Sequence, residues 1–204
     1  MFNLPSLHSM ALMLPAIILG LTFHEYAHGW VADRLGDHTA REHGRLTINP
    51  LAHVDPVGFL LLFLAGFGWA KPVPVNPYNL KGDARQGMLL VALAGPATNM
   101  IMAFLSALLL GTFGSLGLPY FVEVMYYMIL INVVLAVFNL IPIPPLDGSK
   151  ILAGILPGQQ KWLYQLETYG FIILIILILT GAIRLLFRFF VSPIVNFLFA
   201  IVGF

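Results

Sequence analysis

The sequence predicts an all-α polytopic membrane protein, and both its composition and its long apolar segments support this fold class. Of its 204 residues, 59% are hydrophobic and 9% are charged, whereas soluble domains carry roughly 25% charged residues. So few charges cannot cover the surface of a globular domain. Several apolar segments also reach the length of about 20 residues that a spanning helix needs. The net charge of +1 gives no reason to expect nucleic-acid binding.

Four to five transmembrane helices are expected. Apolar spans cover residues 9–35, 86–113, 120–140 and 163–181, and Gly95-Pro96 should kink the second of them. The tail, residues 182–204, is a fifth span, a re-entrant piece or an interfacial helix. Residues 58–69 are apolar but too few to cross the bilayer, which predicts a short re-entrant or interfacial helix. No linker or charge block separates a second unit, so we expect residues 1–204 to form one integral-membrane domain.

Small β elements are expected near the cytoplasmic side, because residues 71–77 read KPVPVNP. Each proline pushes the residue before it out of the helical region. The missing N–H groups confine such a stretch to a sheet edge or a loop.

The distribution of basic residues predicts the orientation of the spans. Basic residues lie between the first and second spans (Arg34, Arg41, Arg45, Lys71, Lys81, Arg85) and between the third and fourth (Lys150, Lys161). The first ten residues and the turn at residues 114–121 contain no Lys or Arg. We therefore expect both basic connections to be cytoplasmic and the N-terminus to face outward.

The first span contains the motif HEYAH at residues 24–28, toward its cytoplasmic end. The spacing i, i+4 places His24 and His28 on one face of a helix, where both can bind one zinc ion. Glu25 lies beside that face and can act as the general base toward a water molecule. The alternative is a chance match at a polar helix end. However, a single charge at the centre of a membrane helix costs about 2.5–3.5 kcal/mol, and a bound metal would offset that cost.

A catalytic zinc site usually has three protein ligands and one open position. The chain has no cysteine, so the third ligand must be His, Asp or Glu. Asp147 is the best candidate, because it follows a proline-interrupted helix end at the same expected depth as HEYAH. Broken backbone at membrane depth survives only where protein or a water-filled cavity satisfies it.

Three motifs together resemble those of the site-2 protease family of intramembrane zinc metalloproteases. They are HEYAH, GPATN at residues 95–99 and NLIPIPPLDG at residues 139–148. Residues 44–56 and 68–77 are similar to its compact bacterial and archaeal branch, which lacks PDZ and CBS domains. The resemblance spans about residues 10–160. It implies Zn²⁺ as cofactor, His24, His28 and Asp147 as ligands, and Glu25 as catalytic base.

The resemblance also favours substrate or oxyanion binding by Asn99 and Asn139. The alternative for each is a helix–helix hydrogen bond, which is a common use of asparagine in membranes. Residues 71–77 could capture an unwound substrate by β-augmentation, or they could form a structural hairpin.

The function we expect is hydrolysis of peptide bonds in or near transmembrane segments of other proteins. The partners would be the lipid bilayer and a membrane-protein substrate. The sequence does not decide whether the protein forms a homo-oligomer. The expected location is a prokaryotic cell membrane, with the site toward the cytoplasm. A zinc-binding or zinc-transport protein without hydrolytic activity is the alternative, since buried His and Asp would also serve a transporter. A membrane scaffold would leave Glu25 and Asp147 without a purpose.

Overall fold

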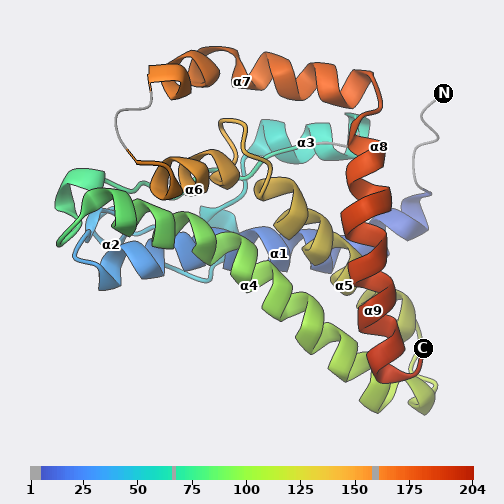
Figure 1. Cartoon of the computed structure of the whole chain (residues 1–204). Coiled ribbons are helices and arrows are strands. Elements are labelled where there is room, and N and C mark those ends of the chain that lie inside the picture. Colours follow the sequence, from blue (N-terminus) through green and yellow to red (C-terminus); the bar gives the residue numbers. More distant parts are fainter. Residues whose placement is uncertain (1–5, 66–67, 158–160) are drawn as a thin grey trace.

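The structure, a computed structural model, describes residues 6–65, 68–157 and 161–204. Four helices in this part of the chain are long and apolar enough to cross a membrane (Figure 1). They are α1 (Leu7–Arg34), α4 (Ala84–Phe113), α5 (Phe121–Asn139) and a C-terminal helix at Ile183–Val202. This last helix consists of α8 (Ile183–Leu186), a π-helical turn (Phe187–Val191) and α9 (Ser192–Val202). The predicted polytopic helical fold is thus confirmed, with four helices of spanning length.

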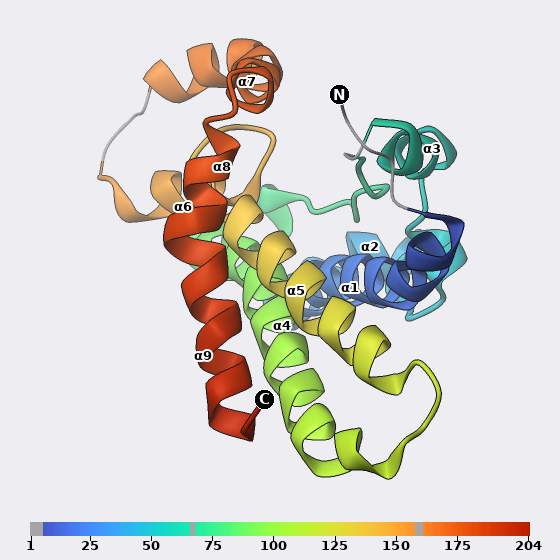
Figure 2. The same ribbon diagram turned by 90° about the vertical axis from the view of Figure 1, so that its right-hand side faces the viewer.

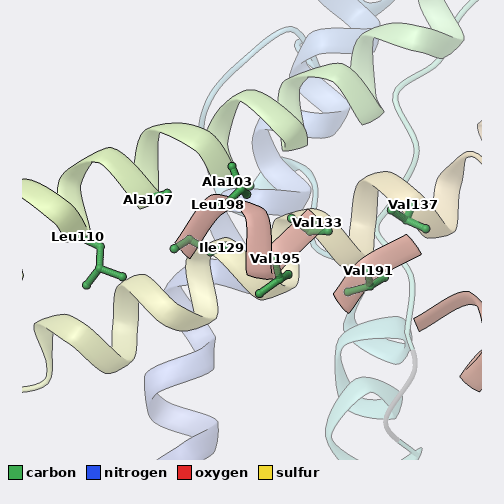
Figure 3. Close-up of a cluster of buried hydrophobic side chains, with 9 residues drawn as sticks. All are labelled: Ala103, Ala107, Leu110, Ile129, Val133, Val137, Val191, Val195 and Leu198. Atoms are coloured by element: carbon green, nitrogen blue, oxygen red, sulfur yellow. The ribbon is translucent and has the colours of Figure 1, made fainter. Parts of the chain in front are cut away.

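One apolar core joins α4, α5 and the C-terminal helix (Figure 3). Its buried residues are Ala103, Ala107, Leu110, Ile129, Val133, Val137, Val191, Val195 and Leu198. Ala103, Ala107 and Gly111 follow one another at four-residue spacing on α4, and a Cβ on Gly111 would lie 2.7 Å from the Cβ of Val202. Small residues let membrane helices approach closely enough to gain packing contacts. This stripe explains why the C-terminal helix packs against α4.

The last part of the chain forms α7 and the C-terminal helix. α7 (Lys161–Leu179) forms where the fourth span was expected, and its fully described part, Leu166–Leu179, is an apolar helix. It lies across the top of the molecule in Figures 1 and 2. Gly170 packs so closely there that a Cβ would meet the carbonyl oxygen of Pro144 at 2.1 Å. The tail, which the sequence left open, provides one of the four helices of spanning length in the described residues.

Residues 36–83 connect α1 to α4 through short helical turns. These are α2 (Thr39–Glu42), η1 (Pro50–Ala52), α3 (Pro56–Ala65) and η2 (Pro77–Asn79). α3 lies where a short re-entrant or interfacial helix was expected. It starts at a proline, which suits the first helical position. The chain before and after α3 meets in an isolated bridge between Val54 and Ala70.

The expectation of small β elements is wrong for the residues that the structure describes. The Val54–Ala70 bridge is the single β pairing in them, and no strand forms. Residues 71–76 are extended but form no ladder beyond the bond from the Lys71 N–H to the His53 carbonyl at 2.8 Å, because prolines at positions 72 and 74 remove every second N–H that a ladder would need. Figure 1 shows this stretch as an open connection that runs from α3 toward the start of α4.

Candidate metal centre

Two histidines on α1 form the first half of the site. His24 and His28 lie one helical turn apart, and their side chains face α4 and are buried, with 5% and 8% of each residue exposed. Their Nε2 atoms are 3.0 Å apart. The i, i+4 spacing therefore brings the two ring nitrogens to one point, as the sequence predicts.

Asp147 completes the site from α6 (Asp147–Ile155), of which it is the first residue. Its Oδ2 lies 3.2 Å from Nε2 of His24 and 3.2 Å from Nε2 of His28. The next residue must be small, because a Cβ on Gly148 would come within 2.3 Å of the carbonyl oxygens of Leu140 and Ile141. The tight turn after α5 thus aims the carboxylate of Asp147 at the histidine pair.

Hydrogen bonds behind the rings fix their orientation. Nδ1 of His24 is 2.6 Å from Oδ1 of Asn99, and Nδ1 of His28 is 2.7 Å from the backbone carbonyl of Val91. Both acceptors are oxygens, so each Nδ1 carries the hydrogen and donates it. Each neutral ring then presents a bare lone pair at Nε2. A partner of this kind on the far ring nitrogen is typical of metal-binding histidines.

The three converging atoms suit a cation. Two Nε2 lone pairs and one carboxylate oxygen face each other without a hydrogen between them, and Oδ2 of Asp147 is buried without a hydrogen-bond partner. Such an arrangement is repulsive unless a positive charge lies among the three atoms. Ligands of one tetrahedral zinc ion at about 2.0–2.1 Å lie roughly 3.3 Å apart. The observed separations of 3.0, 3.2 and 3.2 Å are close to that value.

Gly95 leaves the room that an ion would need. This residue lies on α4 opposite the histidines, and a Cβ there would be 2.5 Å from Nε2 of His28 and 2.6 Å from Nε2 of His24. Any side chain would therefore fill the space in front of the two ring nitrogens. In the part of the chain that the structure describes, His24, His28 and Asp147 are the one group of three His, Cys, Asp or Glu residues that could hold a metal.

Glu25 lies beside the site and is held by a residue far away in the sequence. The backbone N–H of Val73 donates to its Oε2 at 2.8 Å. No hydrogen bond to Oε1 occurs among the described residues, so this oxygen is able to accept a proton. The extended residues 71–76 therefore contact the residue that the sequence marks as the general base.

The two predicted asparagines have different surroundings. Asn99 is fully buried, and its amide donates to the backbone carbonyl of Gly20 at 3.0 Å and to Oδ1 of Asn132 at 2.9 Å. Because its Oδ1 accepts from His24, Asn99 has the contacts of a residue that orients a metal-binding histidine. Asn139 donates to Leu135 on its own helix at 2.9 Å. Substrate binding by either asparagine stays a prediction.

Sequence reasoning missed three contributors to the site: Gly95 as the opening in front of the rings, the Val91 carbonyl, and Asn132, which supports Asn99. One signal was available in GPATN. Gly95 and Asn99 are four residues apart, so they lie on the same face of α4, where a small residue leaves space and the amide reaches a ring. The Val91 carbonyl leaves no trace in the sequence, because every residue has a carbonyl.

Comparison with known proteins gives one family. The model of peptidase family M50 matches residues 112–181. A Bacillus subtilis protein named "Putative zinc metalloprotease YwhC" is 42% identical over 182 residues, covering 84% of this chain and 81% of that protein. "Putative zinc metalloprotease Rip2" of Mycolicibacterium smegmatis is 32% identical, over 85% of this chain and 68% of its own length. "Putative zinc metalloprotease MJ0611" of Methanocaldococcus jannaschii is 32% identical, over 74% and 75%. No solved structure gives a significant match.

Proposed function

Because this chain belongs to peptidase family M50, the site-2 protease family, we propose that it is an intramembrane endopeptidase. Its relatives and its apolar helices make it a membrane zinc metalloprotease. Its substrates would be membrane proteins that are cut in or near a transmembrane segment. The observation that carries this proposal is the convergence of His24, His28 and Asp147 inside a set of apolar helices.

His24, His28 and Asp147 would hold the zinc ion, and Glu25 would act as the general base. When bound, zinc polarises a carbonyl and lowers the pKa of a water molecule to about 7. Oε1 of Glu25 takes the proton from the attacking water and then gives it to the leaving amine. General acid–base help of this kind contributes roughly 10²–10⁴ in rate. Asn139 is the candidate for a contact to the substrate backbone, whereas the predicted contact by Asn99 would require its bonds to His24, Gly20 or Asn132 to break.

The membrane location has consequences for the substrate. A peptide bond inside a helix is hydrogen-bonded and shielded, so the substrate helix must unwind before the bond reaches Glu25. We expect the enzyme in a prokaryotic cell membrane, with the site toward the cytoplasm. Residues 1–204 would act as one domain, and the partners would be the bilayer and the substrate protein.

Zinc transport is the alternative function. A transport path needs several metal-binding positions across the bilayer, each with its own polar or ionisable side chains. Within the described residues a single such group exists. That group also has Glu25 beside it, which a transporter would not need. Hydrolysis is therefore the better-supported function.

The deciding experiment compares the wild type with Glu25→Gln. Each protein is co-expressed with single-span membrane proteins that carry a tag at both ends, and cleavage is followed by immunoblot. The wild type should cleave at least one of them. Glu25→Gln should lose more than a hundredfold in rate and keep one zinc ion per chain by mass spectrometry. Cleavage by the variant at the wild-type rate would contradict the protease mechanism and favour transport.

A further inference from the structure

One backbone N–H links the connection between α1 and α4 to the general base. Val73 lies 48 positions after Glu25 and donates to its Oε2 at 2.8 Å. Val73 is buried, with 8% of its surface exposed. Its two neighbours, Pro72 and Pro74, have no N–H. The Val73 N–H is therefore the one backbone donor among these three residues, and it donates its hydrogen bond to Glu25.

The extended residues are attached to the protein at both ends. Before Val73, the guanidinium of Arg45 donates through Nη2 to the carbonyls of Lys71 at 2.8 Å and Pro72 at 3.2 Å. After Val73, the N–H of Asn76 donates to the fully buried carboxylate of Asp37 at 2.7 Å. Neither attachment is made by α1 itself. These two attachments hold the backbone on both sides of Val73, in addition to the packing of this stretch against α1.

Close packing on α1 keeps the N–H within reach of the carboxylate. Gly29 lies one helical turn after Glu25 on the same face. A Cβ on Gly29 would come within 3.0 Å of Cγ1 of Val73, so the glycine lets the extended residues lie directly against the helix. The fixed φ angles of the flanking prolines reduce the freedom of the backbone on both sides of Val73.

We propose that residues 71–76 position Glu25, with the Val73 N–H as the contacting group and with Arg45 and Asp37 as its supports. The inference rests on the proposed function, in which Glu25 is the general base. A free glutamate side chain samples many rotamers. Binding Oε2 to a fixed N–H restricts the carboxylate and leaves Oε1 to take the proton. Residues 71–76 would then act on the catalytic rate, whereas substrate capture by this stretch would act on substrate affinity.

The contact itself can be tested without any substrate. Amide hydrogen exchange is measured for the zinc-loaded protein in detergent, in the wild type and in Glu25→Ala. Loss of the carboxylate should speed exchange of the Val73 amide by at least about tenfold, as for an opened local hydrogen bond. The Asn76 amide should keep its wild-type rate, because Asp37 holds it. Unchanged exchange at Val73 in Glu25→Ala would overturn the proposal.

The effect on catalysis needs a change that removes the N–H and keeps the side chain. Val73→2-hydroxyisovaleric acid, introduced as an unnatural residue, replaces the N–H by an ester oxygen. The same replacement at Val75 is a matched control, because the Val75 N–H donates no hydrogen bond within the described residues. The substrate is a single-span protein found by the co-expression screen. The ester at Val73 should lower kcat by about tenfold to a hundredfold, as for a slightly misplaced catalytic group.

The positioning role predicts kinetics that a purely structural role does not. If residues 71–76 position Glu25, the ester at Val73 should leave KM, zinc content and Tm at the values of the Val75 ester, while kcat alone falls. A change in KM with unchanged kcat, or equal kcat for both esters, would overturn the positioning role. If the wild type cleaves no membrane protein, the proposed function fails, and the exchange experiment still decides whether Val73 holds Glu25.

Discussion

Asn99 holds His24 in the tautomer that a metal ligand needs. Its Oδ1 lies 2.6 Å from Nδ1 of His24. The orientation of the Asn99 amide is itself determined, because Nδ2 must donate to the backbone carbonyl of Gly20 at 3.0 Å. Oδ1 of Asn132 accepts the second amide hydrogen at 2.9 Å. The hydrogen bonds therefore run from α5 through α4 to α1, and they end at the ring that faces Asp147.

Removing the acceptor should weaken zinc binding. In Asn99→Leu, which keeps the size of the side chain, Nδ1 of His24 loses its partner and the ring can rotate or change tautomer. Loss of such a partner typically lowers metal affinity by about 10–100-fold. Competition with a chelator, followed by metal analysis, measures the change. Asn139→Leu is the control, because its amide bonds within its own helix, and it should keep wild-type zinc affinity. Equal affinity in both variants would contradict this role of Asn99.

Gly95→Ala should remove zinc from the protein. The added Cβ would lie about where the two ring nitrogens converge, at 2.5 and 2.6 Å from them. Gly87→Ala lies two turns earlier on α4 and is a matched control, since its Cβ would meet the flexible side chain of Leu80 at 2.9 Å. Mass spectrometry of the purified proteins should find zinc in Gly87→Ala and little in Gly95→Ala. Full zinc content in Gly95→Ala would show that the ion lies elsewhere.

The sequence indicates the ligands because their chemistry is unusual for a membrane helix. Two histidines one turn apart and a lone carboxylate after a proline-rich turn stand out from an apolar background, and a metal explains why they are tolerated. The contact between Val73 and Glu25 has no such signal. Any residue except proline carries an N–H, and 48 positions separate the partners. Local pattern cannot predict which backbone group meets which side chain across that distance.

In the fold, too, local sequence predicts some elements, and contacts between distant residues decide others. The spans at α1, α4 and α5 follow from continuous apolar length. The tail could not be assigned in this way, because its apolar stretch is close to the minimum length of a spanning helix. Packing places this helix, since Ala103, Ala107 and Gly111 on α4 accept it. That preference depends on which helix faces the small residues, which only the three-dimensional arrangement shows.

Asp37 should make stability depend on pH. Burial raises the pKa of this carboxyl, but hydrogen bonds from Thr39, Asn76 and Asn79 outweigh burial, so its pKa lies below the ordinary value. A depressed pKa means that the folded protein favours the charged form. The stabilisation is complete above the pKa of the unfolded chain, about 3.9, and is lost as the pH falls through the lower pKa of the folded protein.

Asp37→Asn should therefore lower the free energy of unfolding at pH 7 by about 1.5–3 kcal/mol, the value of hydrogen bonds to a charged group. The difference in Tm between this variant and the wild type should shrink when the pH drops below about 4. Thermal unfolding in detergent between pH 7 and pH 3 measures it. Asp83→Asn serves as control, because Asp83 caps α4 through the N–H of Arg85 and asparagine caps equally well. A constant difference in Tm across this pH range would contradict the role of the Asp37 charge.

The orientation in the membrane can be tested directly, because the chain has no native cysteine. The excess of Lys and Arg between α1 and α4 predicts that this connection is cytoplasmic and that the turn between α4 and α5 is external. Glu42→Cys and Ser115→Cys place one thiol in each, at exposed positions, and neither removes a basic residue. A membrane-impermeant maleimide added to intact cells should label Ser115→Cys, and Glu42→Cys only after the membrane is opened. Labelling of Glu42→Cys in intact cells would reverse the topology and place the metal centre toward the outer side.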